Sequence, residues 1–245
     1  HFGQADPHSA VGLPRPLAIQ SETSMTCYFQ GCSAKGTTKE HIPPRSFFPE
    51  GEKEQLLTVK SCEKHNNAKS IDDLYVLAQI CMNASPNNRA REVWESKIVP
   101  QLEFNNGALR KRLAAGSVPL PSGAVKYKVD LKRLDEFFSA LSCGIVYKTC
   151  KTSLPENYSI GHIYHNFVGQ TDPTIQAIET EIEKFYSGKP MDFMSFGEPG
   201  TKNERIYTVT IFGIPGYQSS ITVVHVFFGV FKVTSMLTRT LSKNG

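Results

Sequence analysis

Apolar residues recur with different periods in different parts of the chain, and these periods predict its elements. Within residues 25–85, short apolar segments at 38–42 and 56–60 predict two strands. Between 70 and 81, apolar residues recur at helical spacing on one face, and Ser70 suits the N-cap position before two acidic residues. The pattern therefore predicts a unit in the order strand, loop, strand, helix.

The rest of the chain changes from helical to strand-like patterns. Helical spacing predicts two short helices at 91–98 and 107–115, which are separated by Pro100 and followed by a Pro/Ser/Gly linker at 119–123. It also predicts a longer helix at 131–147. Residues 205–212 and 221–237 are dense in β-branched and aromatic side chains, and the glycines between them suit a turn, so we expect an antiparallel sheet. The predicted fold class is α+β.

These patterns divide the chain into four parts. Residues 1–24 hold three prolines and no initiating methionine, and we interpret them as a vector-derived leader or a disordered extension. Residues 25–85 form the small strand and helix module, and residues 86–130 form a basic helical segment. Residues 131–245 form a β-rich accessory domain of α+β type, with a predicted role in recognition, homodimer formation or regulation.

The distribution of charge along the chain is more informative than the total charge. The formal net charge of +4 permits a polyanionic partner without requiring one. Residues 86–133, however, carry ten cationic and four anionic side chains, a local net charge of +6. The cationic run Arg110, Lys111 and Arg112 lies in this stretch, and it suits either contact with the DNA backbone or a solvated helix face.

The number of cysteines and the hydropathy of the chain indicate the cellular compartment in which we expect the protein. Six cysteines in a chain of 245 residues do not resemble the dense disulfide framework of small secreted domains. No apolar run reaches the roughly 18 residues that a membrane-spanning helix requires. We therefore predict a cytoplasmic protein without a membrane partner, in which Cys81, Cys143 and Cys150 are small core residues.

The other three cysteines and one histidine have the spacing of metal ligands. Cys27 and Cys32 precede the first predicted strand, and Cys62 and His65 lie at the start of the helix. Four ligands of these types make a closed, structural Zn²⁺ site. Such a site would join the loop to the helix in a module too small to have a sufficient core of its own. The spacing alone also fits a zinc-ribbon-like binding module without catalysis.

Two strings of residues add further chemistry to the zinc ligands. One reads EHIPPRSFFP from Glu40, and the other reads CEKHNNAKSIDD from Cys62. In this order and spacing, they resemble the zinc-bearing branch of the HNH endonuclease family over residues 27–82. The chain departs from that family in the four residues between its first two cysteines, and in His65, where a fourth cysteine is usual.

The resemblance implies a ββα-metal fold with a structural Zn²⁺ and a catalytic Mg²⁺ or Mn²⁺. It makes His41 the general base, with its ring oriented by a neighbouring carbonyl or side chain, and Glu40 and Asn66 the ligands of the catalytic cation. The residue types suit phosphodiester hydrolysis, which requires a base that titrates near neutrality and oxygen ligands for a hard cation. The implied substrate is DNA, and a restriction or phage-defence role rests on family analogy.

Each assignment has a structural alternative at this stage. Glu40 also fits a solvated carboxylate on an edge strand, and His41 fits a histidine held by structural hydrogen bonds. Asn67 competes with Asn66 for the cation, and either fits a helix cap. Two further side chains suit either phosphate contact or simple solvation, namely Arg45 and Lys69.

Three functions follow from these alternatives. The favoured one is a metal-dependent HNH DNA endonuclease whose C-terminal domain supplies recognition, dimerisation or regulation. The second is a non-catalytic zinc module that binds nucleic acid or protein. The third is a nuclease that acts on RNA or as a secreted toxin, which the lack of an export signal disfavours.

Overall fold

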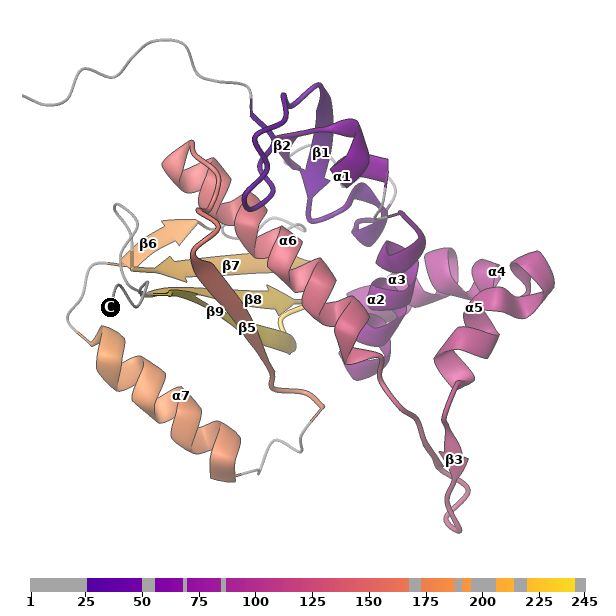
Figure 1. The fold of residues 1–245 in the computed structure, drawn as a ribbon. Coiled ribbons are helices and arrows are strands. Elements are labelled where there is room, and N and C mark those ends of the chain that lie inside the picture. Colours follow the sequence, from indigo (N-terminus) through magenta and orange to yellow (C-terminus); the bar gives the residue numbers. More distant parts are fainter. Residues whose placement is uncertain are drawn as a thin grey trace, which may run out of the picture.

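An antiparallel hairpin and the helices that follow it form the N-terminal part of the molecule, shown in indigo and purple in the computed structural model of Figure 1. Strands β1 (Thr38–Ile42) and β2 (Leu57–Ser61) pair so that His41 lies opposite Thr58. Helices α1 (Glu63–Asn67) and α2 (Ser70–Asn83) follow. The structure describes residues 26–49, 56–67, 70–84, 87–167, 173–187, 191–194, 206–213 and 220–240. The predicted order of strand, loop, strand and helix is confirmed.

The middle of the chain is helical but breaks at a different place from the predicted one. Helix α3 (Asn88–Val93) continues through a π-helical turn, η2 (Trp94–Ile98), into α4 (Val99–Leu102), with Pro100 in the first turn of α4. The Val99 N–H donates to the Trp94 carbonyl across the π-helical turn, so Pro100, which has no N–H to donate, directly follows an interruption of the regular α-helical pattern. The break falls in α5 (Phe104–Ala114), where residues 105–107 have positive φ angles that asparagine and glycine tolerate.

A short hairpin replaces the linker predicted at residues 119–123. Strands β3 (Val118–Pro119) and β4 (Val125–Lys126) pair in antiparallel fashion. Figure 1 shows this hairpin projecting away from the rest of the molecule.

A five-stranded antiparallel sheet forms the C-terminal part. Its order is β5-β9-β8-β7-β6, and helix α7 (Pro173–Tyr186) lies between β5 and β6 in the sequence. The predicted strand at 221–237 is in fact two strands, because Phe228 and Gly229 have positive φ angles and form a turn. The strand bounds are β5 Tyr158–Tyr164, β6 Met191–Met194, β7 Tyr207–Phe212, β8 Ser220–Phe227 and β9 Phe231–Arg239. The α+β class is confirmed.

Helix α6 (Leu131–Cys150) connects the two parts, since it packs against the sheet on one side and against β1 and β2 on the other. Ring stacking joins Phe47, next to the hairpin, to Phe137 of α6 with centroids 5.2 Å apart. Gly144 leaves room for Ile42, because a Cβ atom at this glycine would lie only 3.0 Å from the Ile42 side chain. One hydrophobic core therefore runs across the boundary predicted at residues 130–131.

The positions of the cysteines and the composition of the helices can be compared with the predictions of core cysteines and of no membrane partner. Cys81 and Cys143 are buried core residues, as expected, and Cys150 is half-buried against the core. All six cysteines are free thiols. Among the helices in the described part of the chain, none combines the length and apolar composition that a membrane crossing requires.

Polar side chains line the contact between α6 and the sheet. The buried ring of His225 hydrogen-bonds to Ser142 through Nε2 at 2.9 Å and to Tyr207 through Nδ1 at 2.8 Å. His162 lies in the same way between the hydroxyls of Ser139 and Ser235, each 2.9 Å away. Desolvation lowers the pKa of both imidazoles and so favours their neutral form, in which one nitrogen donates and the other accepts.

Acid should destabilise the fold through His225. Burial lowers the pKa of this imidazole from 6.5 to about 3. The unfolded chain then binds a proton that the folded chain does not bind, so stability present above pH 6.5 is lost as the pH falls towards 3. We expect His225 to contribute a slope of up to about 1.4 kcal/mol per pH unit in this range.

Urea unfolding of the wild type and of His225→Gln at several pH values between 7 and 4 measures this contribution. Glutamine also donates and accepts, but it does not titrate in this range. The free energy of unfolding of the variant should depend less steeply on pH. Equal slopes in the two proteins would show that His225 does not contribute to the acid sensitivity.

Candidate metal centre and nuclease site

The four predicted zinc ligands converge on one point. Their ligand atoms all lie within 4.8 Å of one another. His65 Nδ1 is 3.4 Å from the sulfur of Cys27 and 3.3 Å from that of Cys62. A tetrahedral Zn²⁺ with sulfur at 2.3 Å and nitrogen at about 2.0 Å would separate these atoms by about 3.5 Å. The residues therefore fit zinc, and they form the one group of this kind among the described residues.

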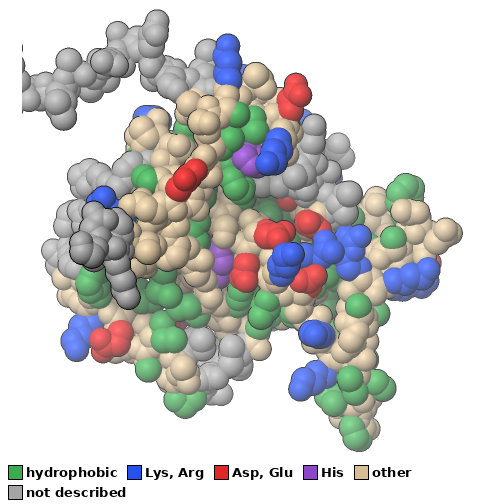
Figure 2. Space-filling view, in the orientation of Figure 1, with side chains coloured by type: hydrophobic (Ala, Val, Ile, Leu, Met, Phe, Trp, Pro, Cys, Tyr) green, Lys and Arg blue, Asp and Glu red, His purple; other side chains and the backbone are tan. Residues whose placement is uncertain are grey.

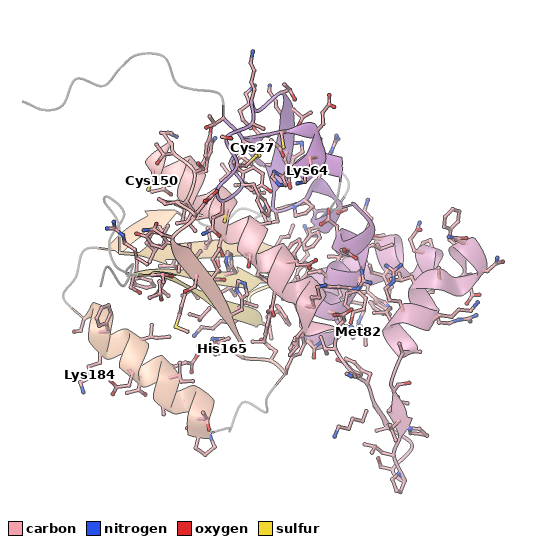
Figure 3. All side chains as sticks on the ribbon, viewed as in Figure 1. Cys27, Lys64, Met82, Cys150, His165 and Lys184 are labelled. Carbon is pink, nitrogen blue, oxygen red and sulfur yellow. The ribbon has the colours of Figure 1, made fainter. Side chains whose placement is uncertain are left out.

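Local backbone structure brings these ligands together. The loop that carries Cys27 and Cys32 folds back on itself, because Cys27 N–H donates to the Ala34 carbonyl and Cys32 N–H donates to the Phe29 carbonyl. Tyr28 N–H donates to the Lys60 carbonyl and so fixes this loop to β2, which ends just before Cys62. His65 follows in the first turn of α1, and Figure 3 shows Cys27 near this helix, which carries the labelled Lys64.

The electrostatics of the cluster suit a bound cation. The backbone N–H of His65 at the start of α1 lowers the pKa of the Cys62 thiol, whereas burial raises the pKa of the Cys27 thiol. A zinc ion at this point would stabilise both thiolates, because it would supply a positive charge next to the two sulfurs. The ring of Phe29 stacks on His65 with centroids 4.1 Å apart and covers this ligand on one side.

Glu40 and His41 lie on opposite faces of β1. The side chain of Glu40 points inward, is only 9% exposed and accepts a hydrogen bond from the Tyr28 hydroxyl, whose pKa is raised chiefly by burial. Ile42 points the same way, towards α6. Since successive side chains alternate along a strand, His41 points to the other face. The burial of Glu40 excludes the alternative of a solvated carboxylate on an edge strand.

His41 is half-buried on the outer face of the hairpin. Its Nδ1 atom is buried and makes no hydrogen bond to any of the described residues, so the orienting partner that we expected is missing from that part of the chain. The alternative of a histidine held by structural hydrogen bonds at Nδ1 therefore finds no support there. Burial lowers the pKa of His41, and the nearby Arg45 guanidinium lowers it further, so the ring is neutral near pH 7.

The other candidates for the catalytic site lie on α1 and beside it. Asn66 is half-buried in the first turn of α1, where its N–H donates to the Cys62 carbonyl, and α1 contacts β1. Arg45 is exposed at the start of the short 3-10 helix η1 (Arg45–Phe47). The side chain of Asn67 and the whole of Lys69 lie outside the described residues.

The cationic run lies on α5, beyond the zinc module. Lys111 is exposed and Arg112 is half-buried, and Arg110 is exposed with its guanidinium 2.7 Å from the carboxylate of Glu103. This run and the His41 region therefore occupy different elements, which Figure 1 shows in different parts of the molecule. Contact with DNA stays a prediction for both.

Sequence reasoning did not identify two residues that support the site. Tyr28 binds Glu40, and Phe29 stacks on the zinc ligand His65. Both directly follow Cys27, and aromatic residues inside a small zinc loop have little core to occupy other than the ligands themselves. Their position next to the zinc ligand Cys27 was the feature of the sequence that could have identified them.

Comparisons with known proteins found no family model, no curated protein and no solved structure that matches this chain. The functional argument therefore depends on the residues and their geometry.

Removing one zinc ligand should unfold the module. Cys62→Ser should lose the single zinc ion, and the melting temperature should fall by roughly 10 °C or more because the loop, β2 and α1 are joined at this point. Elemental analysis and calorimetry measure the two effects. The control is Cys150→Ser, which changes a half-buried cysteine outside the cluster and should keep one zinc per chain. A zinc-free wild type, or a Cys62→Ser protein with unchanged melting, would contradict the assignment.

Proposed function

We propose that this chain is a metal-dependent DNA endonuclease of the HNH type, with His41 as its general base. The observation that carries the proposal is the half-buried imidazole of His41, whose Nδ1 has no partner among the described residues. A buried polar atom without a hydrogen bond is uncommon and calls for an explanation such as a ligand or a catalytic role. His41 lies on the outer face of a hairpin that the zinc ligands hold against α1.

The residues around His41 support a hydrolytic step. In the neutral state, the imidazole takes a proton from water while the water oxygen forms a bond to phosphorus. The bond from phosphorus to the leaving sugar oxygen breaks, and that oxygen takes a proton from solvent. Arg45, whose charge acts on His41, is suited to bind a non-bridging phosphate oxygen.

A catalytic cation belongs to this proposal. Asn66 supplies an amide oxygen from α1, and Glu40 supplies a carboxylate from β1, and both are ligand types that Mg²⁺ or Mn²⁺ prefers. When bound, the cation would neutralise the charge that develops on the phosphate. Glu40 fits this role less well than Asn66, because its carboxylate binds Tyr28 on the face of β1 opposite to His41.

The position of Glu40 favours a second candidate function. A zinc-binding module without catalysis would also use a buried Glu40 bound to Tyr28, because that contact fastens β1 to the zinc loop. Such a module would bind nucleic acid or protein through its outer face. The two functions differ in what His41 and the divalent cation contribute, so the following two experiments distinguish them.

Substitution of His41 should abolish cleavage without affecting the fold. We expect His41→Ala to slow plasmid cleavage by about 10²-fold to 10⁴-fold, the range typical for loss of a general base. Zinc content, melting temperature and DNA affinity should stay close to wild type. The matched control is Thr58→Ala, the cross-strand neighbour of His41, which should keep its activity. Full activity in His41→Ala would refute the mechanism, and a wild type inert with Mg²⁺ and Mn²⁺ on DNA and RNA would favour the binding module.

Metal dependence should separate the roles of Asn66 and Glu40. If each binds the catalytic cation, Asn66→Ala and Glu40→Gln should lose cleavage at low Mg²⁺ and recover part of it as Mg²⁺ is raised, which His41→Ala cannot do. Tyr28→Phe keeps the Glu40 carboxylate but removes its hydrogen bond, so it should cost about 1.5–3 kcal/mol of stability and leave the metal dependence unchanged.

If Glu40 is structural instead, Glu40→Gln will behave like Tyr28→Phe, with a lower melting temperature and an unaltered metal requirement. Zinc content must be measured in Asn66→Ala, because Asn66 follows the ligand His65. Loss of zinc from that variant would remove it from the comparison, and Glu40→Gln would then decide the role of the oxygen ligands alone.

A further inference from the structure

The β3–β4 hairpin exposes apolar side chains at its tip. Val118 is 56% exposed, Leu120 42% and Val125 58%. Figure 2 shows green apolar side chains gathered at the end of this projection. Exposed apolar groups placed together on an arm, rather than scattered singly, indicate a surface that another molecule covers.

The tip is a defined structure with a fixed base. Leu120 N–H donates to the Ala124 carbonyl at 2.8 Å, and Gly123 N–H donates back to the Leu120 carbonyl at 3.0 Å. Prolines at 119 and 121 restrict the backbone on either side of Leu120. At the base, the Tyr127 hydroxyl donates to Asn83 of α2 at 3.1 Å. Hydrogen bonds and prolines therefore restrict the backbone on which Leu120 is carried.

The arm that carries this apolar tip holds cationic side chains and no acidic ones. Between Glu103 and Asp130 the chain holds five lysines and arginines and no aspartate or glutamate. Four of the five form no ion pair with another described residue, namely Lys111, Arg112, Lys126 and Lys128. An apolar tip on an arm whose charged side chains are all cationic matches a polyanion that has apolar surface inside a groove.

We propose that the β3–β4 hairpin is a wedge that enters the minor groove of duplex DNA. In this proposal, Leu120 and its apolar neighbours insert beside a base step while Lys126 and Lys128 contact the flanking phosphates. Proteins that bend DNA use apolar side chains in this way. The four steps along the chain from Gly116 to Leu120 reach at most about 14 Å, which exceeds the minor-groove depth of about 7.5 Å.

The charges favour DNA over a second copy of this chain. A two-fold contact between hairpins would place Lys126 and Lys128 near the same lysines of the other copy, and like charges would repel. Two strands of two residues each also offer far less than the roughly 800 Å² per partner of a standard protein interface. The choice of DNA over an anionic lipid surface rests on the proposed nuclease function.

Binding and bending of DNA test the wedge without requiring cleavage. The full chain with His41→Ala, in buffer without Mg²⁺, is mixed with a 30-base-pair duplex that carries a fluorophore at each end, and energy transfer reports the bend. In this background, Val118→Ser, Leu120→Ser and Val125→Ser together should abolish bending and weaken affinity about tenfold, with an unchanged salt dependence. Val99→Ser with Phe104→Ser is the matched control, because these exposed apolar residues lie on α4 and α5.

Substitution of the lysines should have the complementary effect. Lys126→Ala with Lys128→Ala should reduce the slope of log affinity against log salt by about 1.8, since each phosphate contact contributes about 0.9. Melting temperatures close to that of the parent protein would show that the arm variants are folded. Unchanged bending in the triple serine variant would overturn the proposal.

The same variants also test whether a lipid surface or a second copy of this chain covers the hairpin tip instead of DNA. Binding of the parent protein to vesicles of phosphatidylserine and phosphatidylcholine that the triple serine variant loses, with DNA bending unaffected, would overturn the proposal in favour of a lipid surface. A dimer that becomes a monomer in that variant would overturn it in favour of self-association. DNA bending by a wild type that cleaves nothing would support the wedge and contradict the proposed nuclease activity. Cleavage by the wild type, together with DNA bending and affinity that the triple serine substitution does not change, would support the nuclease activity and contradict the wedge.

Discussion

Burial of helix α6 on two sides is the constraint on which the rest of the structure depends. From Ala140 to Val146 every residue of the helix is buried, which is the pattern of a helix surrounded by protein rather than lying on a surface. The sheet covers one side, and the β1–β2 hairpin covers the other. Neither part has a complete core without this helix, so the hairpin that carries His41 is held in place by residues about a hundred positions later in the chain.

The zinc cluster and α6 stabilise the hairpin from its two ends. The cluster holds the loop before β1 against the first turn of α1, and α6 receives Ile42 in the space left by Gly144. Between these two attachments, β1 has one face turned inward, with Glu40, and one face turned outward, with His41. The His41 imidazole on such a strand is kept in position by contacts that other residues of the hairpin make.

The sequence was informative where the determinants are local. Ligand spacing at Cys27, Cys32, Cys62 and His65 predicted the cluster because a metal ion requires few residues at short intervals, and the strands and helix around it were correctly placed. The break at residues 105–107 and the turn at Phe228 and Gly229 were missed because they depend on single backbone angles. The inward direction of the Glu40 side chain was also missed. The pattern of β1 alone does not reveal that this polar side chain faces α6 and hydrogen-bonds to Tyr28. The catalytic roles of His41, Glu40 and Asn66 stay predictions.

The hydrogen-bonded pairs of serine and histidine between α6 and the sheet determine how the helix is aligned on the sheet. A smooth apolar helix can slide or rotate by a turn on a sheet with little loss, because one methyl group replaces another. Ser139 and Ser142 lie three residues apart on one face of α6 and bind histidines on different strands, β5 and β8. Any other setting of the helix would leave both imidazoles, the buried His225 and the half-buried His162, without these hydroxyls. The two contacts fix the height and the rotation of α6 on the sheet, and through the contact of Gly144 with Ile42 they also fix where the β1–β2 hairpin lies.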